Sequence, residues 1–209
     1  MLCGVLWRDG LLGLDARYVL TPITPRAHTV TLCLCFSLPK RTSILNVEQH
    51  CVTVTSATTA QDMTQAAELF REYADSLGLD LAFQNFNHEI AHLPGEYAPP
   101  RGSLLLAYVD HALAGCCALR PLDTFDTPNA AEMKRLYVRK AFRGFGLGRQ
   151  LAEATLDAAR QAGYACVLLD TLDDMEAARN LYTDLGFEET TPYYHNPIGG
   201  AHYLKAVID

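Results

Sequence analysis

The chain has 209 residues, of which 49% are hydrophobic and 20% are charged, and its net charge at pH 7 is −7. These values are typical of one globular domain and leave little room for a second. The acidic balance disfavours a nucleic acid or an anionic membrane as a partner, because both bind to broad basic surfaces.

The seven cysteines show no pattern of a metal or redox site, since no two of them have the C-x-x-C spacing. An odd number of cysteines fits buried thiols in a reducing compartment. The longest apolar run, near residues 30–38, is too short to span a membrane, and no signal-like segment begins at Met1. We therefore expect a cytoplasmic protein without a metal ion and without a membrane partner.

Residues 1–50 differ from the rest of the chain. They carry five basic and three acidic residues, whereas residues 51–209 carry twelve and twenty-one. They also lack a sustained hydrophobic period. We predict a poorly organised N-terminal extension over 1–50, either a loose segment or a region upstream of the true start, followed by one domain over 51–209.

The first half of this domain alternates between strand and helix patterns. The expected elements are a strand over 51–56, helices over 63–77 and near 83–93, a loop over 94–102, a hairpin of 104–109 and 112–119, a loop over 121–131 and a strand over 132–138. Apolar residues at helical spacing predict a helix that begins near Leu151 and is closed by Gly163.

The second half continues in the same way. A buried strand over 166–169 ends at Asp170, and a helix with apolar residues from Ala178 to Leu185 ends at Gly186. Asp173 and Glu176 have the spacing of a capping box before that helix. Two final strands are expected around Phe187 and over 202–207. This order of elements predicts a single α/β domain with a mixed sheet.

A glycine-rich turn is the most informative motif of the chain. From Leu136 to Gly148 the sequence reads LYVRKAFRGFGLG, a strand-like run that breaks into glycines and opens onto a helical pattern. Such a turn exposes backbone N–H groups at a helix N-terminus, where they and the helix dipole favour an anion. Six basic residues cluster around it: Lys134, Arg135, Arg139, Lys140, Arg143 and Arg149. This cluster suits a small polyphosphate ligand.

Two familiar phosphate-binding motifs do not fit this turn. A nucleotide P-loop requires Lys and Ser or Thr after its last glycine, but Gly148 is followed by Arg149 and Gln150. A dinucleotide fingerprint requires a third glycine, and Arg149 stands in its place. The preceding strand also carries Glu132 and further charges, which do not suit a fully buried parallel strand.

The residues instead resemble the GNAT N-acetyltransferase superfamily, from about residue 52 to the end of the chain. Arg143-x-x-Gly146-x-Gly148 matches its Q/R-x-x-G-x-G/A pattern. The strand over 132–138 is similar to the fourth strand of that family, and 180–187 is similar to its L-Y-x-x-L-G-F helix ending. The resemblance implies a mixed central sheet flanked by helices, in which the fourth and fifth strands splay apart.

The same resemblance implies that acetyl-CoA is the cosubstrate. The loop amides from Arg143 to Gly148 would bind its pyrophosphate, with glycines that let the backbone approach closely. Main-chain groups near Leu136 and Val138 would pair with the pantetheine arm, and an N–H there would polarise the thioester carbonyl. The expected cofactor-binding residues are Leu136, Tyr137, Val138, Arg143, Gly144, Phe145, Gly146, Leu147, Gly148 and Arg149.

Two residues match catalytic positions of the family. Tyr182 stands where relatives place the tyrosine that protonates the CoA sulfur, although its helical spacing also fits a core aromatic. Glu132 stands where some relatives hold the glutamate that deprotonates the amine, although it could equally be a surface or strand-edge carboxylate. One departure lies at 173–175, where many relatives carry an asparagine that contacts the cofactor.

The predicted function is direct, sequential transfer of an acetyl group from acetyl-CoA to a primary amine of a small molecule. An acidic body suits a cationic amine, with Asp123, Asp126 and Glu132 as anionic contacts. The alternatives are acetylation of a protein N-terminus or lysine, and a non-catalytic CoA-binding module. The aromatic end around Tyr193 and Tyr194 fits either an acceptor pocket or a homodimer contact.

Overall fold

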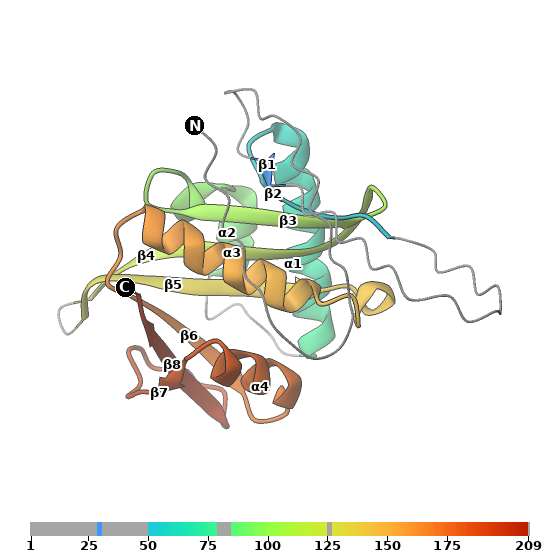
Figure 1. Ribbon diagram of the computed structural model, residues 1–209. Coiled ribbons are helices and arrows are strands. Elements are labelled where there is room, and N and C mark those ends of the chain that lie inside the picture. Colours follow the sequence, from blue (N-terminus) through green and yellow to red (C-terminus); the bar gives the residue numbers. More distant parts are fainter. Residues whose placement is uncertain (1–28, 31–49, 79–84, 125–126, 209) are drawn as a thin grey trace, which may run out of the picture.

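A mixed eight-stranded sheet forms the centre of the molecule, in the order β1-β2-β3-β4-β5-β6-β8-β7. The computed structural model describes residues 29–30, 50–78, 85–124 and 127–208 (Figure 1). Within these residues β5 and β6 pair in parallel, and every other pair of neighbours is antiparallel. The predicted α/β fold with a mixed sheet is confirmed.

The elements follow the predicted order of strands and helices. They are β1 (Thr29–Val30), β2 (Val52–Ser56), α1 (Ala60–Leu77), α2 (Phe86–Ala91), the 3-10 helix η2 (Gly95–Tyr97), β3 (Ser103–Val109), β4 (Ala112–Thr124), β5 (Thr127–Val138), the 3-10 helix η3 (Lys140–Phe142), α3 (Leu147–Gln161), β6 (Cys166–Leu172), α4 (Glu176–Asp184), β7 (Glu188–Glu189) and β8 (Ala201–Val207).

The prediction for residues 1–50 lies almost entirely outside the described residues. Thr29 and Val30 are described, and they pair with Thr55 and Val54 of β2 as the edge strand β1. The division into an extension and a domain from residue 51 stays a prediction.

Helix α1 begins and ends at residues that cap it. The Asp62 amide donates a hydrogen bond to the Thr59 hydroxyl at 3.2 Å, and the Thr59 amide donates one to the Asp62 carboxylate at 2.8 Å. This reciprocal pair satisfies N–H groups that have no partner inside the helix. Gly78, with φ of +63°, ends the helix in the left-handed conformation.

Helices cover both faces of the sheet. Figure 1 shows α3 lying across β3, β4 and β5, with α1 behind these strands. The apolar side of α3, which includes Leu147 and Leu151, forms the main core with the sheet. Tyr182 of α4 joins the same core, whereas Phe70 of α1 belongs to a second cluster on the opposite face.

The β3–β4 hairpin turns at Asp110 and His111, as predicted. Both residues have positive φ, of 49° and 68°. Positive φ at both central residues characterises the type I′ turn, whose twist matches that of the flanking strands.

The loop predicted over 121–131 is wrong. Strand β4 continues to Thr124 and β5 begins at Thr127, and Leu122 pairs with Ala130 in the resulting long hairpin. The prolines and polar residues of this stretch interrupt the apolar alternation, so the local pattern indicates a turn. Pairing with a neighbouring strand overrides that local preference.

The capping box predicted before α4 is also wrong. The helix starts at Glu176, after Met175, and no side chain caps it. The Asp173 carboxylate instead lies 2.5 Å from Nε2 of His202 on β8. Strand β6 extends to Leu172, two residues beyond its predicted end, because β8 pairs with its whole length.

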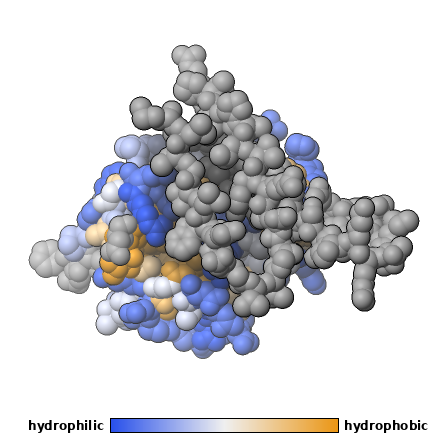
Figure 2. Space-filling model, in the orientation of Figure 1, coloured by the Kyte–Doolittle hydropathy of each residue, from blue (hydrophilic) through white to orange (hydrophobic). Residues whose placement is uncertain are grey.

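Hydrophilic residues cover most of the described surface in Figure 2, and hydrophobic residues gather mainly to the left of its centre. Two large hydrophobic side chains of the described residues are exposed, Phe145 at 37% and Val207 at 73%. In the described part of the chain, no helix combines the length and the apolar character that crossing a membrane requires.

Candidate active site

Strands β5 and β6 separate partway along their length. Their parallel ladder joins residues 130–132 to residues 166–168 and then ends. Beyond it, β5 stays paired with β4 and β6 stays paired with β8, and Figure 1 shows the two strands diverging. One edge of β5 after Glu132 therefore has no strand partner among the described residues. Counted from β2, these are the fourth and fifth strands, so the predicted splay is confirmed.

A β-bulge at Arg135 changes which side chains face the opening. Cys116 pairs with Tyr137 and Ala118 pairs with Lys134, so two residues of β5 oppose one residue of β4. Arg135 has φ of +58°, an uncommon value for a residue other than glycine. The bulge interrupts the alternation of side chains, so that Lys134 and Arg135 both reach acidic partners.

The glycine-rich turn opens onto the N-terminus of α3. Gly144 and Gly146 have φ of +94° and +72°, values that favour glycine. Gly146 precedes the helix without a side-chain cap, so the N–H groups of the first turn are free to bind an anion. A Cβ on Gly144 would meet no atom of the described residues within 4 Å, so these residues leave the space in front of this turn open.

Most of the basic residues clustered around this turn pair with acidic side chains. Four of the six bind acids: Lys134 with Glu132, Arg135 with Glu89, Arg139 with Glu68 and Glu72, and Arg149 with Asp184. Arg143 is exposed, and its Nε donates to the Val138 carbonyl at 3.2 Å. The anion site therefore rests chiefly on backbone N–H groups.

The side chains of the other predicted cofactor residues face different ways. Leu136 and Val138 pack against the core on the α3 face, whereas the Tyr137 ring lies 6.0 Å from that of Tyr73 on the opposite face. Leu147 is buried beneath the start of α3, at 1% exposure. Of these residues, Leu136 lines the pocket between β5 and β6.

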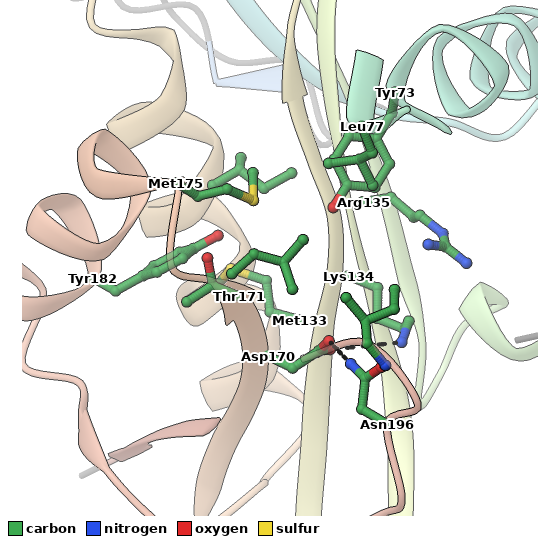
Figure 3. A pocket seen from close by; sticks show the side chains of 13 residues that line it. Tyr73, Leu77, Met133, Lys134, Arg135, Asp170, Thr171, Met175, Tyr182 and Asn196 are labelled. Atoms are coloured by element: carbon green, nitrogen blue, oxygen red, sulfur yellow. Dashed lines mark hydrogen bonds and ion pairs between the residues drawn. The ribbon is translucent and has the colours of Figure 1, made fainter. Parts of the chain in front are cut away.

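A pocket occupies the gap between the separated strands (Figure 3). Its walls come from the end of α1, from β5 at and before the bulge, from β6, and from the segment before β8. Charged groups of both signs line it, Lys134 and Arg135 on β5 and Asp170 on β6. Met175 also lines it, so a thioether stands in the segment where many relatives carry asparagine.

Tyr182 lies on the α4 side of this pocket. Its ring packs 5.6 Å from the Phe187 ring in the main core, and Figure 3 shows its hydroxyl pointing towards the gap. Burial raises the pKa of this hydroxyl well above its ordinary value, so it is protonated at neutral pH. The residue is both a core aromatic and a hydroxyl donor at the pocket wall.

Glu132 is buried in an ion-pair network beside the pocket. Its carboxylate accepts hydrogen bonds from Arg120 Nε at 2.7 Å, from the Tyr193 hydroxyl at 2.9 Å and from Lys134 Nζ at 3.4 Å. Burial alone would raise the pKa of this carboxyl, but the charges of Lys134 and Arg120 outweigh burial and lower it. The alternative of a surface carboxylate is wrong, and the general-base role stays a prediction.

Asp170 is the carboxylate that faces the pocket. Its Oδ2 accepts a hydrogen bond from the Tyr194 hydroxyl at 2.8 Å and one from Asn196 Nδ2 at 3.4 Å. Asn196 lines the pocket, whereas His195, which lies between Tyr194 and Asn196 in the chain, is exposed. The segment before β8 thus reaches the pocket through the amide side chain of Asn196, a residue that carries no signal in the sequence.

Other residues of the pocket carried no sequence signal. Tyr73 and Leu77 lie on the last turns of α1, where their helical spacing indicates only an apolar face. The Thr171 hydroxyl is buried at the pocket wall without a hydrogen-bond partner among the described residues. In the same part of the chain, no three His, Cys, Asp or Glu side chains come close enough to hold a metal ion.

A sheet that splits between two parallel strands, with a glycine turn and a helix N-terminus nearby, defines the class of CoA-dependent acyltransferases. Residues 52–187 match the model of the acetyltransferase (GNAT) family. The chain belongs to this family and is an acetyl-CoA-dependent N-acetyltransferase.

Known proteins agree with this assignment. An uncharacterized N-acetyltransferase of Schizosaccharomyces pombe is 39% identical over 155 residues, which cover 74% of this chain and 93% of that protein. An uncharacterized N-acetyltransferase of Dictyostelium discoideum is 29% identical over 66% of this chain and 90% of that protein. The crystal structure of a GNAT-family acetyltransferase from Staphylococcus aureus has a TM-score of 0.62 at 17% identity, covering 76% of this chain and all of that one.

Proposed function

We propose that this enzyme transfers the acetyl group from acetyl-CoA directly to a primary amine of a small molecule. The observation that carries this proposal is the acceptor side of the pocket. Asn196 and Ile198 line it there, and Tyr193 and Tyr194 pack against Tyr203 behind them. A wall of this kind suits a compact acceptor, whereas a protein substrate needs an open groove for its chain.

The turn from Arg143 to Gly148 and the unpaired edge of β5 would hold the cosubstrate. The free N–H groups at the start of α3 suit the pyrophosphate, and the backbone near Leu136 and Val138 suits the pantetheine amides. Phe145, exposed beside the turn, and Arg149, on the first turn of α3, would flank the phosphates. When bound, acetyl-CoA supplies the activated acyl group.

The charged and hydroxyl groups at the pocket wall supply the proton transfers. Asp170 accepts a proton from the substrate ammonium, so that the neutral amine can attack the thioester carbonyl. A backbone N–H near Leu136 hydrogen-bonds the oxygen that becomes negative. Tyr182 donates its proton to the sulfur as the C–S bond breaks. The attacking nitrogen, which is positively charged after attack, loses its second proton, and this proton restores the tyrosine through solvent. Asp170 releases the first proton to solvent, and the amide product keeps its one N–H.

Direct transfer is supported by the positions of the cysteines. Among the described residues Cys116, Cys117 and Cys166 are buried, and none of the four described cysteines lines the pocket. Burial raises the pKa of the thiols of Cys116 and Cys117, which keeps them protonated and unreactive. A covalent acyl-cysteine intermediate would need a thiolate at the pocket.

The test is a thiol-release assay with acetyl-CoA and a panel of primary amines, with acetylated products identified by mass spectrometry. We expect thiol release that depends on an amine and is strongly reduced in Tyr182→Phe. A rise in melting temperature with CoA but no release with any amine or peptide would indicate a non-catalytic module. Acetylation of peptides alone would indicate a protein acetyltransferase.

A further inference from the structure

We propose that the amine acceptor also carries a carboxylate, which Lys134 binds while Asp170 binds the amine. The substrates would then be amino acids or compounds with the same pair of groups. This inference rests on the proposed function, because it names the substrate class of the same pocket.

Lys134 is a buried cation with unused hydrogen-bonding capacity. Its side chain is 7% exposed and lines the pocket, and its ammonium group has three N–H donors. Among the described residues this group makes one long hydrogen bond, 3.4 Å to Glu132 Oε1, one ion pair, 4.0 Å to Asp170 Oδ1, and a cation–π contact 5.9 Å from the centroid of the Tyr194 ring. Charge-assisted hydrogen bonds are normally about 2.8 Å long, so these contacts leave the ammonium able to bind another anion.

The neighbouring basic side chains are already satisfied. Arg135 donates from Nε and Nη2 to both oxygens of Glu89, at 3.0 and 2.6 Å, and its side chain is 3% exposed. Arg120 donates from Nε to Glu132 at 2.7 Å. Lys134 is therefore the cation of this group that offers free donors to a ligand.

Asp170 offers the complementary charge at a short distance. Tyr194 and Asn196 both donate to its Oδ2, whereas the contact of its Oδ1 with Lys134 is 4.0 Å long. Opposite charges that lie side by side without a direct hydrogen bond match a zwitterion, whose ammonium and carboxylate can each pair with the charge of opposite sign. A cationic amine without a carboxylate would place its charge near Lys134 and would bring no anion of its own to pair with that ammonium group.

This conclusion changes the expected acceptor. The acidic composition of the chain by itself favours a cationic amine, with Glu132, Asp123 and Asp126 as contacts. Glu132 is neutralised by Arg120 and Lys134 and does not line the pocket. The side chains of Asp123 and Asp126 lie outside the described ones.

The experiment compares three matched acceptors with the full-length protein and acetyl-CoA. They are a neutral amino acid, the amide of that amino acid, and the amine that remains when its carboxylate is removed. We expect the amino acid to be acetylated with the highest kcat/KM, on the order of 10- to 100-fold above the other two, which is the range for one hydrogen bond to a charged group. The amide is a stringent control, because its amine is less basic and more readily deprotonated.

The variant Lys134→Met should remove this preference, because the KM for the amino acid should rise until its kcat/KM no longer exceeds that of the amide measured with the same variant. Lys205→Met, which makes the same change on β8 outside the pocket, should leave the preference unchanged. Lys134→Gln tests the same point if the methionine variant does not fold, and the three acceptors on the unmodified protein decide the question without either variant.

Two results would overturn these conclusions, and they differ from one another. Equal acetylation of all three acceptors would refute the carboxylate site and leave the proposed function standing. Absence of thiol release with every primary amine, including a wider panel without carboxylates, would refute the proposed function itself.

Discussion

Replacing Glu132 by glutamine separates a structural role of this carboxylate from a catalytic one. The side chain is 1% exposed and lies 2.7 Å from Arg120 Nε and 3.4 Å from Lys134 Nζ. Removing one partner of a buried ion pair costs about 3–5 kcal/mol, because the other charge stays buried without compensation. Because Arg120 keeps its ion pair with Glu96, we expect Glu132→Gln to lower the free energy of unfolding by about 3 kcal/mol, the lower end of that range.

Urea unfolding at pH 7 measures this loss directly. A loss of about 3 kcal/mol corresponds to a fall in melting temperature of roughly 6–12 °C for a domain of this size. Glu96→Gln is the matched control, because Glu96 is the other acidic partner of Arg120 but is 66% exposed. An exposed ion pair contributes about 0–1 kcal/mol, so the control should unfold close to the unmodified protein.

The pH dependence gives a second check with a defined sign. The pKa of Glu132 in the folded state lies below its ordinary value of 4.5, so the folded protein favours the ionised form. The resulting stability is present above pH 4.5 and is lost as the pH falls through the folded-state pKa. The difference between the protein and Glu132→Gln should therefore shrink in acid.

A small change in stability with a large loss of turnover would refute this reasoning. If Glu132→Gln melts within about 2 °C of the unmodified protein, the network costs under about 1 kcal/mol to break. If its kcat also falls by about 100-fold or more, Glu132 acts as the general base predicted from the family resemblance.

Four further variants test the site and its surroundings. Tyr182→Phe should lower kcat by about 100-fold with much less effect on acetyl-CoA binding, because it removes the proton donor while keeping the ring. Steady-state kinetics measures the first quantity and calorimetry the second. Equal activity of the variant would rule out Tyr182 as the proton donor. Gly146→Ala and Gly163→Ala should each lower the free energy of unfolding by about 1–2 kcal/mol, because both glycines have positive φ. The affinity for acetyl-CoA should fall in Gly146→Ala alone. The imidazole of His202 hydrogen-bonds the carboxylates of Asp173 and Glu189, which raises the pKa of His202. The stability that these bonds add is present at low pH and is lost as the pH rises through the raised pKa. His202→Gln should therefore lower the melting temperature more at pH 6 than at pH 9.

Much of the fold could be predicted because its signals are local. The periodic apolar residues of α1 and α3 and the turn at Asp110 each depend on residues close in the chain. Where the prediction is wrong, distant contacts decide the outcome. The stretch 121–131 becomes a hairpin through strand pairing, and Asp173 bonds His202 instead of capping α4.

The sequence by itself determined the family and the donor side of the reaction. The turn from Arg143 to Gly148 needs glycines at particular positions for a backbone conformation, and such a requirement is written in the order of residues. The tertiary structure alone decided the charges of the acceptor side. Lys134 and Arg135 look alike in the sequence, but Glu89 on α2 satisfies one of them while the other keeps free donors in the pocket. Partners brought together from distant parts of the chain set the effective charge of a buried side chain, and no local pattern encodes them.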